Sequence, residues 1–198
     1  MKNPFRTERL ILRAIEDTPE DDAFVHLVQA DPVSYALSNL SLPRPETMKA
    51  SKEWKTHLTE KCLLAVIICI APSPSGSRET PVPIGIASLT APRPGLEHHR
   101  NSSISIDIVA EHQGKGYGGE AINWILNWGF QMAGLHRIGI DCFSYNAAAL
   151  HLYERLGFVL EGRRRESIWF DGSWHDWVEF GMLEGDWKDK QRRAGGTA

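Results

Sequence analysis

Apolar residues along the chain follow two spacings, and their order predicts a sheet flanked by helices. Alternating or continuous runs rich in Val and Ile predict strands at 9–15, 62–71, 82–91, 103–110, 136–143, 158–170 and 173–187. Amphipathic spacing and capping residues predict helices at 18–29, 45–61, 116–132 and 146–157. Within this order, the strand, helix and strand between 103 and 143 require a parallel crossover, whereas the C-terminal strands form a hairpin. We therefore expect an α/β fold with a mixed sheet.

Composition narrows the organisation and the partners. The chain has 198 residues, of which 42% are hydrophobic, so we expect a single domain over 1–188 followed by a disordered tail at 189–198. A formal net charge of −3 gives no general attraction to polyanions. We expect no nucleic-acid partner.

The cysteines and histidines predict no metal centre. Cys62, Cys69 and Cys142 lack the paired spacing of a zinc site or a disulfide framework, and His98 and His99 have no acidic neighbour in the sequence. No run reaches the ~18 apolar residues of a membrane span, and no leader pattern opens the chain. These features predict a cytoplasmic protein without membrane contact.

Four glycines between strand 103–110 and the next helix form the most informative segment. Gly114, Gly116, Gly118 and Gly119 stand where backbone N–H groups and the positive end of a helix dipole can bind an anion. A tight strand-to-helix turn with close packing would need the same residues. Two phosphate-binding patterns compete for the segment.

The first pattern is the dinucleotide fingerprint GxGxxG. The letters GKGYGG satisfy it, and Asp141 is the acidic residue that would bind a ribose hydroxyl. The residues EHQ separate these glycines from the preceding strand, and the C-terminal hairpin supplies no further strand–helix–strand unit. A nicotinamide-dependent oxidoreductase stays an alternative.

The second pattern covers more of the chain. QGKGYG (113–118) resembles the pyrophosphate loop of the GNAT family of N-acetyltransferases, and NAAALHLYERLGF (146–158) is similar to a later segment of that family. TERLILR (7–13) and WFDGSWHDWVEFGMLEGDW (169–187) resemble its RimJ/RimL-like branch. The resemblance implies a GNAT acyl-CoA N-acyltransferase fold, with a central, splayed mixed sheet, that transfers acetyl from acetyl-CoA to a primary amine. Direct transfer in a ternary complex is implied, and the acceptor would be a protein N-terminus or a small molecule.

The resemblance also implies the residues that contact the coenzyme. The backbone near Val109 would pair with the pantetheine arm and offer an N–H to the thioester carbonyl, while the loop would hold the pyrophosphate. The implied coenzyme-binding residues are Ile108, Val109, Ala110, Gln113, Gly114, Lys115, Gly116, Tyr117, Gly118, Gly119, Asn146 and Tyr153.

Two residues are candidates for proton transfer. Tyr153 shares a helix face with Asn146 and would protonate the departing thiolate, although a tyrosine there can also simply pack its ring. Many GNAT relatives carry a glutamate at a place that falls on Ser103. We therefore expect Asp107 to act as the base, directly or through water, while a carboxylate satisfied by a neighbour remains the alternative.

The acceptor is less defined by the sequence. Asp21, Asp22 and Glu46 are compatible with a cationic amine and equally with ordinary helix starts. The absent strand glutamate makes a non-catalytic acyl-CoA-binding regulator a further alternative. A homodimer is a possible assembly.

Overall fold

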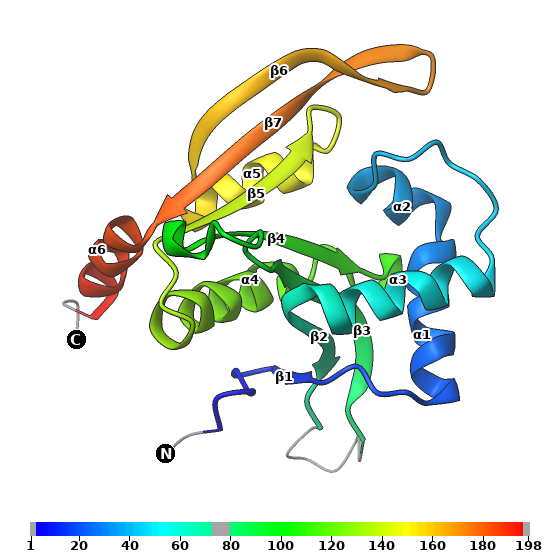
Figure 1. The fold of residues 1–198 in the computed structure, drawn as a ribbon, viewed down its shortest axis with the longest axis horizontal. Helices are drawn as coiled ribbons and strands as arrows, with labels where there is room; N and C mark the ends of the chain where they lie inside the picture. The colour runs from blue at the N-terminus through cyan, green and yellow to red at the C-terminus, as the bar shows by residue number, and fades with distance from the viewer. Residues whose placement is uncertain (1–2, 73–79, 196–198) are drawn as a thin grey trace. The chain divides into compact units, whose positions relative to one another are not determined.

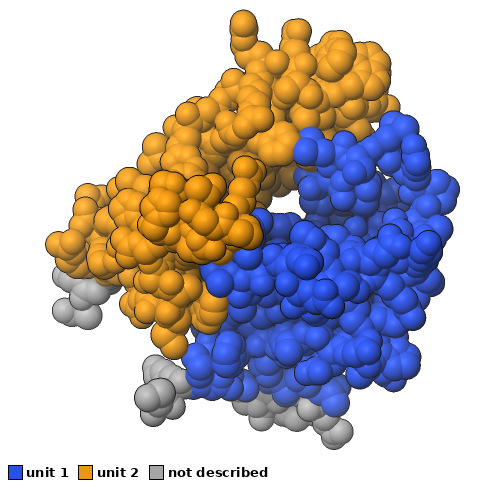
Figure 2. All heavy atoms as spheres, in the orientation of Figure 1, with its two compact units in different colours: residues 1–91, 105–124 blue, residues 92–104, 125–198 orange. Residues whose placement is uncertain are grey.

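The chain divides into two compact units, and its strands form a mixed sheet. A computed structural model describes residues 3–72 and 80–195. Unit 1 comprises residues 1–91 and 105–124, and unit 2 comprises residues 92–104 and 125–198 (Figure 2). Seven strands are hydrogen-bonded in the order β1-β2-β3-β4-β5-β7-β6. Strand β4 (Asn101–Ile108) and helix α4 (Tyr117–Asn127) contribute residues to both units.

Unit 1 holds the N-terminal strands and helices (Figure 1). Its remaining elements are β1 (Leu10–Arg13), α1 (Pro19–Ala30), α2 (Pro32–Ser38), α3 (Met48–Lys61), β2 (Cys62–Ile70), β3 (Val82–Thr90) and a 3-10 turn at Ala110–His112. The strands pair antiparallel, with Leu10 opposite Ile70 and Ile67 opposite Ile86.

The helices of unit 1 begin at side-chain caps. Thr18, Asp31 and Thr47 each accept a hydrogen bond from a backbone N–H in the first turn of α1, α2 and α3, respectively. Such caps satisfy donors that have no partner within the helix. Pro19 and Pro32 follow the first two caps, at a position where a missing N–H costs nothing.

One face of β1–β3 is covered by α1 and α3, which lie side by side in unit 1 (Figure 1). Ile67, Cys69 and Ile86 of the sheet pack with Phe24, Val25 and Val28 of α1 and Leu58 of α3. Residues two apart in a strand share a face, so these three sheet side chains point the same way. Their burial fixes the register of the strands that lead towards β4.

Unit 2 holds the parallel pairing and the C-terminal hairpin. Its elements are a 3-10 turn at Glu97–His99, a π-helical turn at Trp128–Met132, β5 (Arg137–Phe143), α5 (Ala147–Leu156), β6 (Val159–Phe170), β7 (Ser173–Leu183) and α6 (Glu184–Gly195). The parallel pairing of β4 with β5 comprises four residue pairs, from Asn101 with Arg137 to Ile104 with Ile140. Strand β7 pairs antiparallel with both β5 and β6.

Strand β6 ends the sheet order and is irregular. Its pairing with β7 shifts between Arg164 and Ile168, and Glu166 within this bulge has a φ of 50°. The backbone N–H of Glu166 donates to Asp176 Oδ1 at 2.9 Å, which satisfies a group that the bulge removes from the strand ladder. Arg163 and Arg164 form ion pairs with Asp176 and Glu179, respectively.

The expected mixed sheet with a parallel crossover is confirmed, whereas one helix and two C-terminal boundaries differ from expectation. The prediction missed α2, although Asp31 and Pro32 form a cap and a first helical residue. Strand β7 ends at Leu183, and helix α6 then includes residues 189–195, where composition predicted a disordered tail. The residues between the strands expected at 62–71 and 82–91 lie mostly outside the described residues. Within the described ranges, no helix has the length and apolarity to span a bilayer.

Candidate functional site

The glycine segment opens helix α4 with an unusual backbone. Gly114 has a φ of +69° and Gly116 a φ of +84°, values that side-chain-bearing residues rarely adopt. Helix α4 begins at Tyr117, and the first bond back to the loop is from Glu120 N to Gly116 O at 3.2 Å. The N–H groups of the three residues between them have no partner inside the helix. Their direction and the helix dipole suit a diphosphate.

Glu120, in the first turn of α4, is held by the segment before β1. Thr7 Oγ1 donates to Glu120 Oε1 at 2.5 Å, Arg9 N donates to the same oxygen at 2.9 Å, and Arg9 Nε donates to Oε2 at 2.7 Å. Burial opposes ionisation of this carboxyl, but these hydrogen bonds outweigh it and lower its pKa. The Glu120 carboxylate therefore stays ionised beside the loop, where the positive charge of Arg9 compensates its negative charge.

Arg9 also braces the loop itself. Its Nη1 donates to the carbonyl oxygen of Lys115 at 3.0 Å, and its guanidinium lies 4.8 Å from the ring centre of Tyr117. A peptide unit is planar and trans, so holding the Lys115 carbonyl turns the N–H of Gly116 to the opposite side. A Cβ on Gly116 would lie 3.2 Å from Arg9 Nη2. An added Cβ on Gly114 would meet nothing within 4 Å, so at that position only the backbone conformation requires glycine.

The end of β4 lies closely against β3. An added Cβ on Gly85 would meet the Asp107 carbonyl oxygen at 2.3 Å, so the bare glycine permits this approach. Val109 N donates to Ile84 O at 2.9 Å. The N–H that we expected to meet the thioester at Val109 is thus engaged within unit 1. By strand alternation, the N–H of Ile108 points away from β3.

Gln113 joins this strand end to the loop. Its Nε2 donates to the carbonyl oxygen of Ile108 at 2.8 Å and lies 3.3 Å from Ser34 Oγ of α2. Both amide protons therefore have an acceptor within unit 1. Gln113 fixes the backbone between β4 and α4.

Asp107 is half-buried near the end of β4 and contacts α2. Burial raises the pKa of its carboxyl, and a hydrogen bond with Ser38 lowers it by less. A carboxyl with a raised pKa accepts a proton more readily than an ordinary aspartate, as a general base must. The raised pKa of Asp107 suits the role of proton acceptor that we expected for this residue.

Tyr153 and Asn146 belong to unit 2. Tyr153 is 7% exposed, and its ring lies 6.1 Å from that of Phe158 and 5.9 Å from that of Phe180. Asn146 caps α5, since its Oδ1 accepts from Ala149 N at 3.1 Å. Packing thus fixes the position of the phenol ring, and the amide serves a capping role that the sequence analysis did not assign to it.

Ser103 is the residue on which the resemblance led us to expect the place of the strand glutamate. Its Oγ donates to the carbonyl oxygen of Gly139 at 3.3 Å, across the β4–β5 pairing. A serine hydroxyl is no base at neutral pH. The proton acceptor of this chain has to come from another residue or from water.

The acidic residues considered for a cationic acceptor already have partners. Asp21, which is 2% exposed, accepts from the Arg13 guanidinium at 2.6 Å, and Asp22 pairs with Lys55 at 2.6 Å. Glu46 accepts from Ser51 Oγ at 2.8 Å. These contacts stabilise α1 and α3. We therefore assign the three carboxylates to the packing of these helices and not to the binding of an amine acceptor.

The cysteines are poor nucleophiles in their surroundings. Burial raises the pKa of Cys62 and of Cys69, and it raises the pKa of Cys142 to about 12. Thiols that stay protonated near neutral pH do not carry an acyl group efficiently. The described part of the chain contains no cluster of three or more His, Cys, Asp or Glu that could hold a metal ion.

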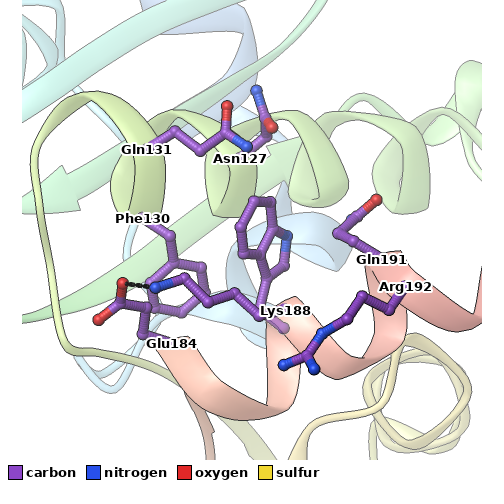
Figure 3. A pocket seen from close by; sticks show the side chains of 8 residues that line it. Asn127, Phe130, Gln131, Glu184, Lys188, Gln191 and Arg192 are labelled. Atoms are coloured by element: carbon purple, nitrogen blue, oxygen red, sulfur yellow. Dashed lines mark hydrogen bonds and ion pairs between the residues drawn. The ribbon is translucent and has the colours of Figure 1, made fainter.

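A separate cavity of about 700 Å³ lies in unit 2 between the end of α4 and α6 (Figure 3). Lys188 in its wall is paired with Glu184, as the dashed line in Figure 3 marks, and Arg192 is paired with Asp189. The Phe130 and Trp187 rings pack against each other at 5.6 Å. None of the predicted site residues lines this cavity.

Comparison with known families decides between the two phosphate-binding patterns. The profile of the acetyltransferase (GNAT) domain matches residues 9–159, which include the loop, the end of β4 and α5. The chain belongs to the GNAT acetyltransferase family. The match to the dinucleotide fingerprint therefore does not reflect the family of this chain. Asp141 lies opposite Glu179 in the β5–β7 pairing.

Similar proteins include polyamine-modifying GNAT members. The spermidine N(1)-acetyltransferase of Vibrio cholerae is 40% identical over 78 residues, which are 39% of this chain and 45% of that protein. YdaF of Bacillus subtilis, by name a candidate ribosomal N-acetyltransferase, is 28% identical over 93 residues, or 47% of this chain and 51% of that protein. The matched segment thus spans about half the length of these relatives.

Solved GNAT structures share the fold. The crystal structure of the Vibrio cholerae spermidine N-acetyltransferase in complex with CoA and spermine superposes with a TM-score of 0.74 and 25% identity, covering 92% of this chain and 99% of that one. A GNAT-family acetyltransferase of Bacillus anthracis gives a TM-score of 0.71 at 20% identity, covering 91% and 98%. The GNAT fold expected from the sequence is confirmed.

Sequence reasoning missed the residues that brace the loop. Thr7 and Arg9 lie in the TERLILR run, which we associated with the family without assigning it a role, and Glu120 received none. Their separation along the chain exceeds a hundred residues. No local pattern reports a contact of that range.

Proposed function

We propose that this GNAT member transfers an acetyl group from acetyl-CoA to a primary amine. The observation that carries the proposal is the positive φ of Gly114 and of Gly116 in the loop that leads directly into α4. A diphosphate is the ligand that such a bend and helix start bind best, and acetyl-CoA carries one. Lys115 to Gly119 would donate the backbone N–H groups.

The transfer needs a proton acceptor, an oriented thioester and a proton donor. In the proposal the Asp107 carboxylate takes a proton from the ammonium acceptor, directly or through water, and the neutral amine nitrogen attacks the thioester carbonyl. The N–H of Ile108, which points away from β3, hydrogen-bonds the coenzyme arm or the carbonyl oxygen in place of that of Val109. As the C–S bond breaks, the Tyr153 hydroxyl protonates the thiolate. The resulting phenolate regains a proton, through water, from the new amide nitrogen, and Asp107 releases its proton to solvent. No covalent enzyme intermediate is required, in keeping with the protonated cysteines.

Small polyamines are the acceptors that we propose first. The support is that a relative at 40% identity and the CoA- and spermine-bound neighbour both carry spermidine acetyltransferase names. A protein N-terminus is the second candidate, favoured by the TERLILR resemblance to the RimJ/RimL-like branch and by the ribosomal name of the Bacillus subtilis relative. We further propose that the protein is cytoplasmic. We also propose that it self-associates, since a Vibrio cholerae relative is described as dodecameric.

Calorimetric titration tests the coenzyme assignment. The chain should bind acetyl-CoA and be indifferent to NAD(H). Binding of NAD(H) without binding of acetyl-CoA would refute the proposal.

Thiol release tests the reaction and the acceptor. Acetyl-CoA should be consumed with spermidine or spermine, and a ribosomal-protein N-terminal peptide and simple amino acids serve as comparison acceptors. Tight acetyl-CoA binding with no thiol release for any amine would instead support the regulatory alternative, in which the absent strand glutamate marks lost activity.

A further inference from the structure

Helix α2 presents two serines on one face to the end of β4. Ser34 and Ser38 are four residues apart, so their side chains lie one above the other along the helix. Ser34 is 6% exposed. Its hydroxyl donates to Asp31 Oδ2, the cap of the same helix, at 2.5 Å, which leaves the hydroxyl oxygen to accept from elsewhere.

Ser34 reaches the coenzyme loop through Gln113. The Gln113 amide lies 3.3 Å from Ser34 Oγ and donates to the Ile108 carbonyl oxygen at 2.8 Å. Successive hydrogen bonds therefore connect Asp31, the cap of α2, to Ser34, to the Gln113 amide and to the backbone of Ile108, where we propose the thioester contact. A shift of α2 would move that amide.

Ser38 reaches the proposed base directly. Its hydroxyl donates to the Ser34 carbonyl oxygen at 3.1 Å and also contacts the Asp107 carboxyl. A hydroxyl has one proton and two lone pairs. When the Asp107 carboxyl is ionised, the Ser38 hydroxyl can donate its proton to it. When the carboxyl is protonated, the Ser38 oxygen can accept from Asp107 while its own proton goes to the Ser34 carbonyl oxygen.

We infer that α2 is the positioning element of the acetyl-transfer site, with Ser34 holding Gln113 and Ser38 holding the Asp107 carboxyl in both of its protonation states. The inference rests on the proposed function. It assigns α2 a task beyond helix packing, since Ser38 contacts Asp107 and Ser34 reaches the carbonyl oxygen of Ile108 through Gln113.

Alanine substitutions separate the two contacts. Ser38→Ala should lower kcat about tenfold with the acetyl-CoA affinity unchanged, because a hydrogen bond to a charged group is lost from the base. Ser34→Ala should weaken acetyl-CoA binding about threefold to tenfold, because Gln113 loses one acceptor. Ser38→Thr keeps the hydroxyl and should restore turnover. Ser41→Ala, on an exposed residue just beyond α2, is the matched control.

A readout at the carboxyl itself keeps the inference independent of activity. The Ser38 hydroxyl lowers the pKa of Asp107 against the larger effect of burial, so Ser38→Ala should move the titration of that carboxyl, followed by carbon-13 NMR, to higher pH. In an active enzyme the acid limb of kcat/KM should move the same way.

The outcomes distinguish this inference from the proposed function. An unmoved Asp107 titration in Ser38→Ala, or Ser34→Ala and Ser38→Ala variants that behave as Ser41→Ala does, would overturn the inference. A wild-type chain that releases no thiol with any amine would overturn the proposed function, while the carboxyl titration would still report on the α2 contact.

Discussion

The candidate functional residues of unit 1 and those of unit 2 are held in place by different interactions. In unit 1, the loop and the start of α4 are held by charge-assisted hydrogen bonds from Arg9 and Thr7. In unit 2, Tyr153 is held by the rings of Phe158 and Phe180. The loop in unit 1 should therefore be sensitive to backbone strain, charge and pH. Removal of the Tyr153 hydroxyl alone should change turnover, because the substitution keeps the packed ring. Three substitutions test this contrast.

The largest effect is expected from Gly116→Val. A branched side chain at a φ of +84° is strained and meets Arg9 at 3.2 Å, so the loop must rearrange. Acetyl-CoA affinity, measured by calorimetry, should fall by about 100-fold or more. Gly95→Val is the matched control, because Gly95 has a φ of +83° with nothing within 4 Å of an added Cβ.

Both valine variants should lose about 1–2 kcal/mol of unfolding free energy, the scale of left-handed strain. Gly95→Val should nevertheless keep its coenzyme affinity. Unchanged acetyl-CoA affinity in Gly116→Val would contradict the assignment of this loop to coenzyme binding. The comparison of the loop with Tyr153 would then have no basis.

Tyr153→Phe should give the next largest effect, on turnover alone. The substitution keeps the ring that packs with Phe158 and Phe180 and removes the proton donor, so kcat should fall about 100-fold. The acetyl-CoA affinity and the melting temperature should stay close to those of the wild type. Steady-state thiol release, calorimetry and thermal unfolding measure the three quantities.

Tyr145→Phe is the control for that experiment. Tyr145 packs on Phe170 at 4.7 Å elsewhere in unit 2 and has no role in the proposed transfer. If both tyrosine variants turned over like the wild type, Tyr153 would be a packing residue and the proton would come from another group.

The smallest effect is expected from the carboxylate at the start of α4. The pKa of Glu120 is lowered from 4.5, so its contribution to stability is present above pH 4.5 and is lost as the pH falls through the lower, folded-state value. Glu120→Gln should lose on the order of 1–2 kcal/mol at neutral pH and show a shallower loss of unfolding free energy below pH 4.5. Denaturant unfolding across this pH range measures both.

Glu53→Gln should leave that acid dependence as in the wild type, because Glu53 is 70% exposed and pairs with Lys49 at 3.8 Å. Equal acid dependence in Glu120→Gln and Glu53→Gln would mean that Arg9 and Thr7 do not stabilise the loop through this carboxylate.

Local sequence signals predicted most of the framework. The alternation in β4 and β5, the glycines at 114 and 116 and the end of α5 at Gly157 are each encoded by a few neighbouring residues. Such features follow from backbone preference and from one buried face, and both can be read within a short window. The mixed sheet followed from their order.

The parts that were missed depend on distance or on very short elements. Helix α2 has 7 residues, too few for a periodic pattern despite its cap and proline. Glu120 and Gln113 make their bonds with residues 113 and 79 positions away, respectively, and only folding brings such partners together. The engagement of the Val109 N–H with Ile84 likewise depends on strand register.

The bulge in β6 has a consequence for assembly. The kink at Glu166 and the neighbouring arginines interrupt the ladder of amides that this edge strand would offer to a further strand. Regular growth of the sheet along this part of β6 is therefore disfavoured.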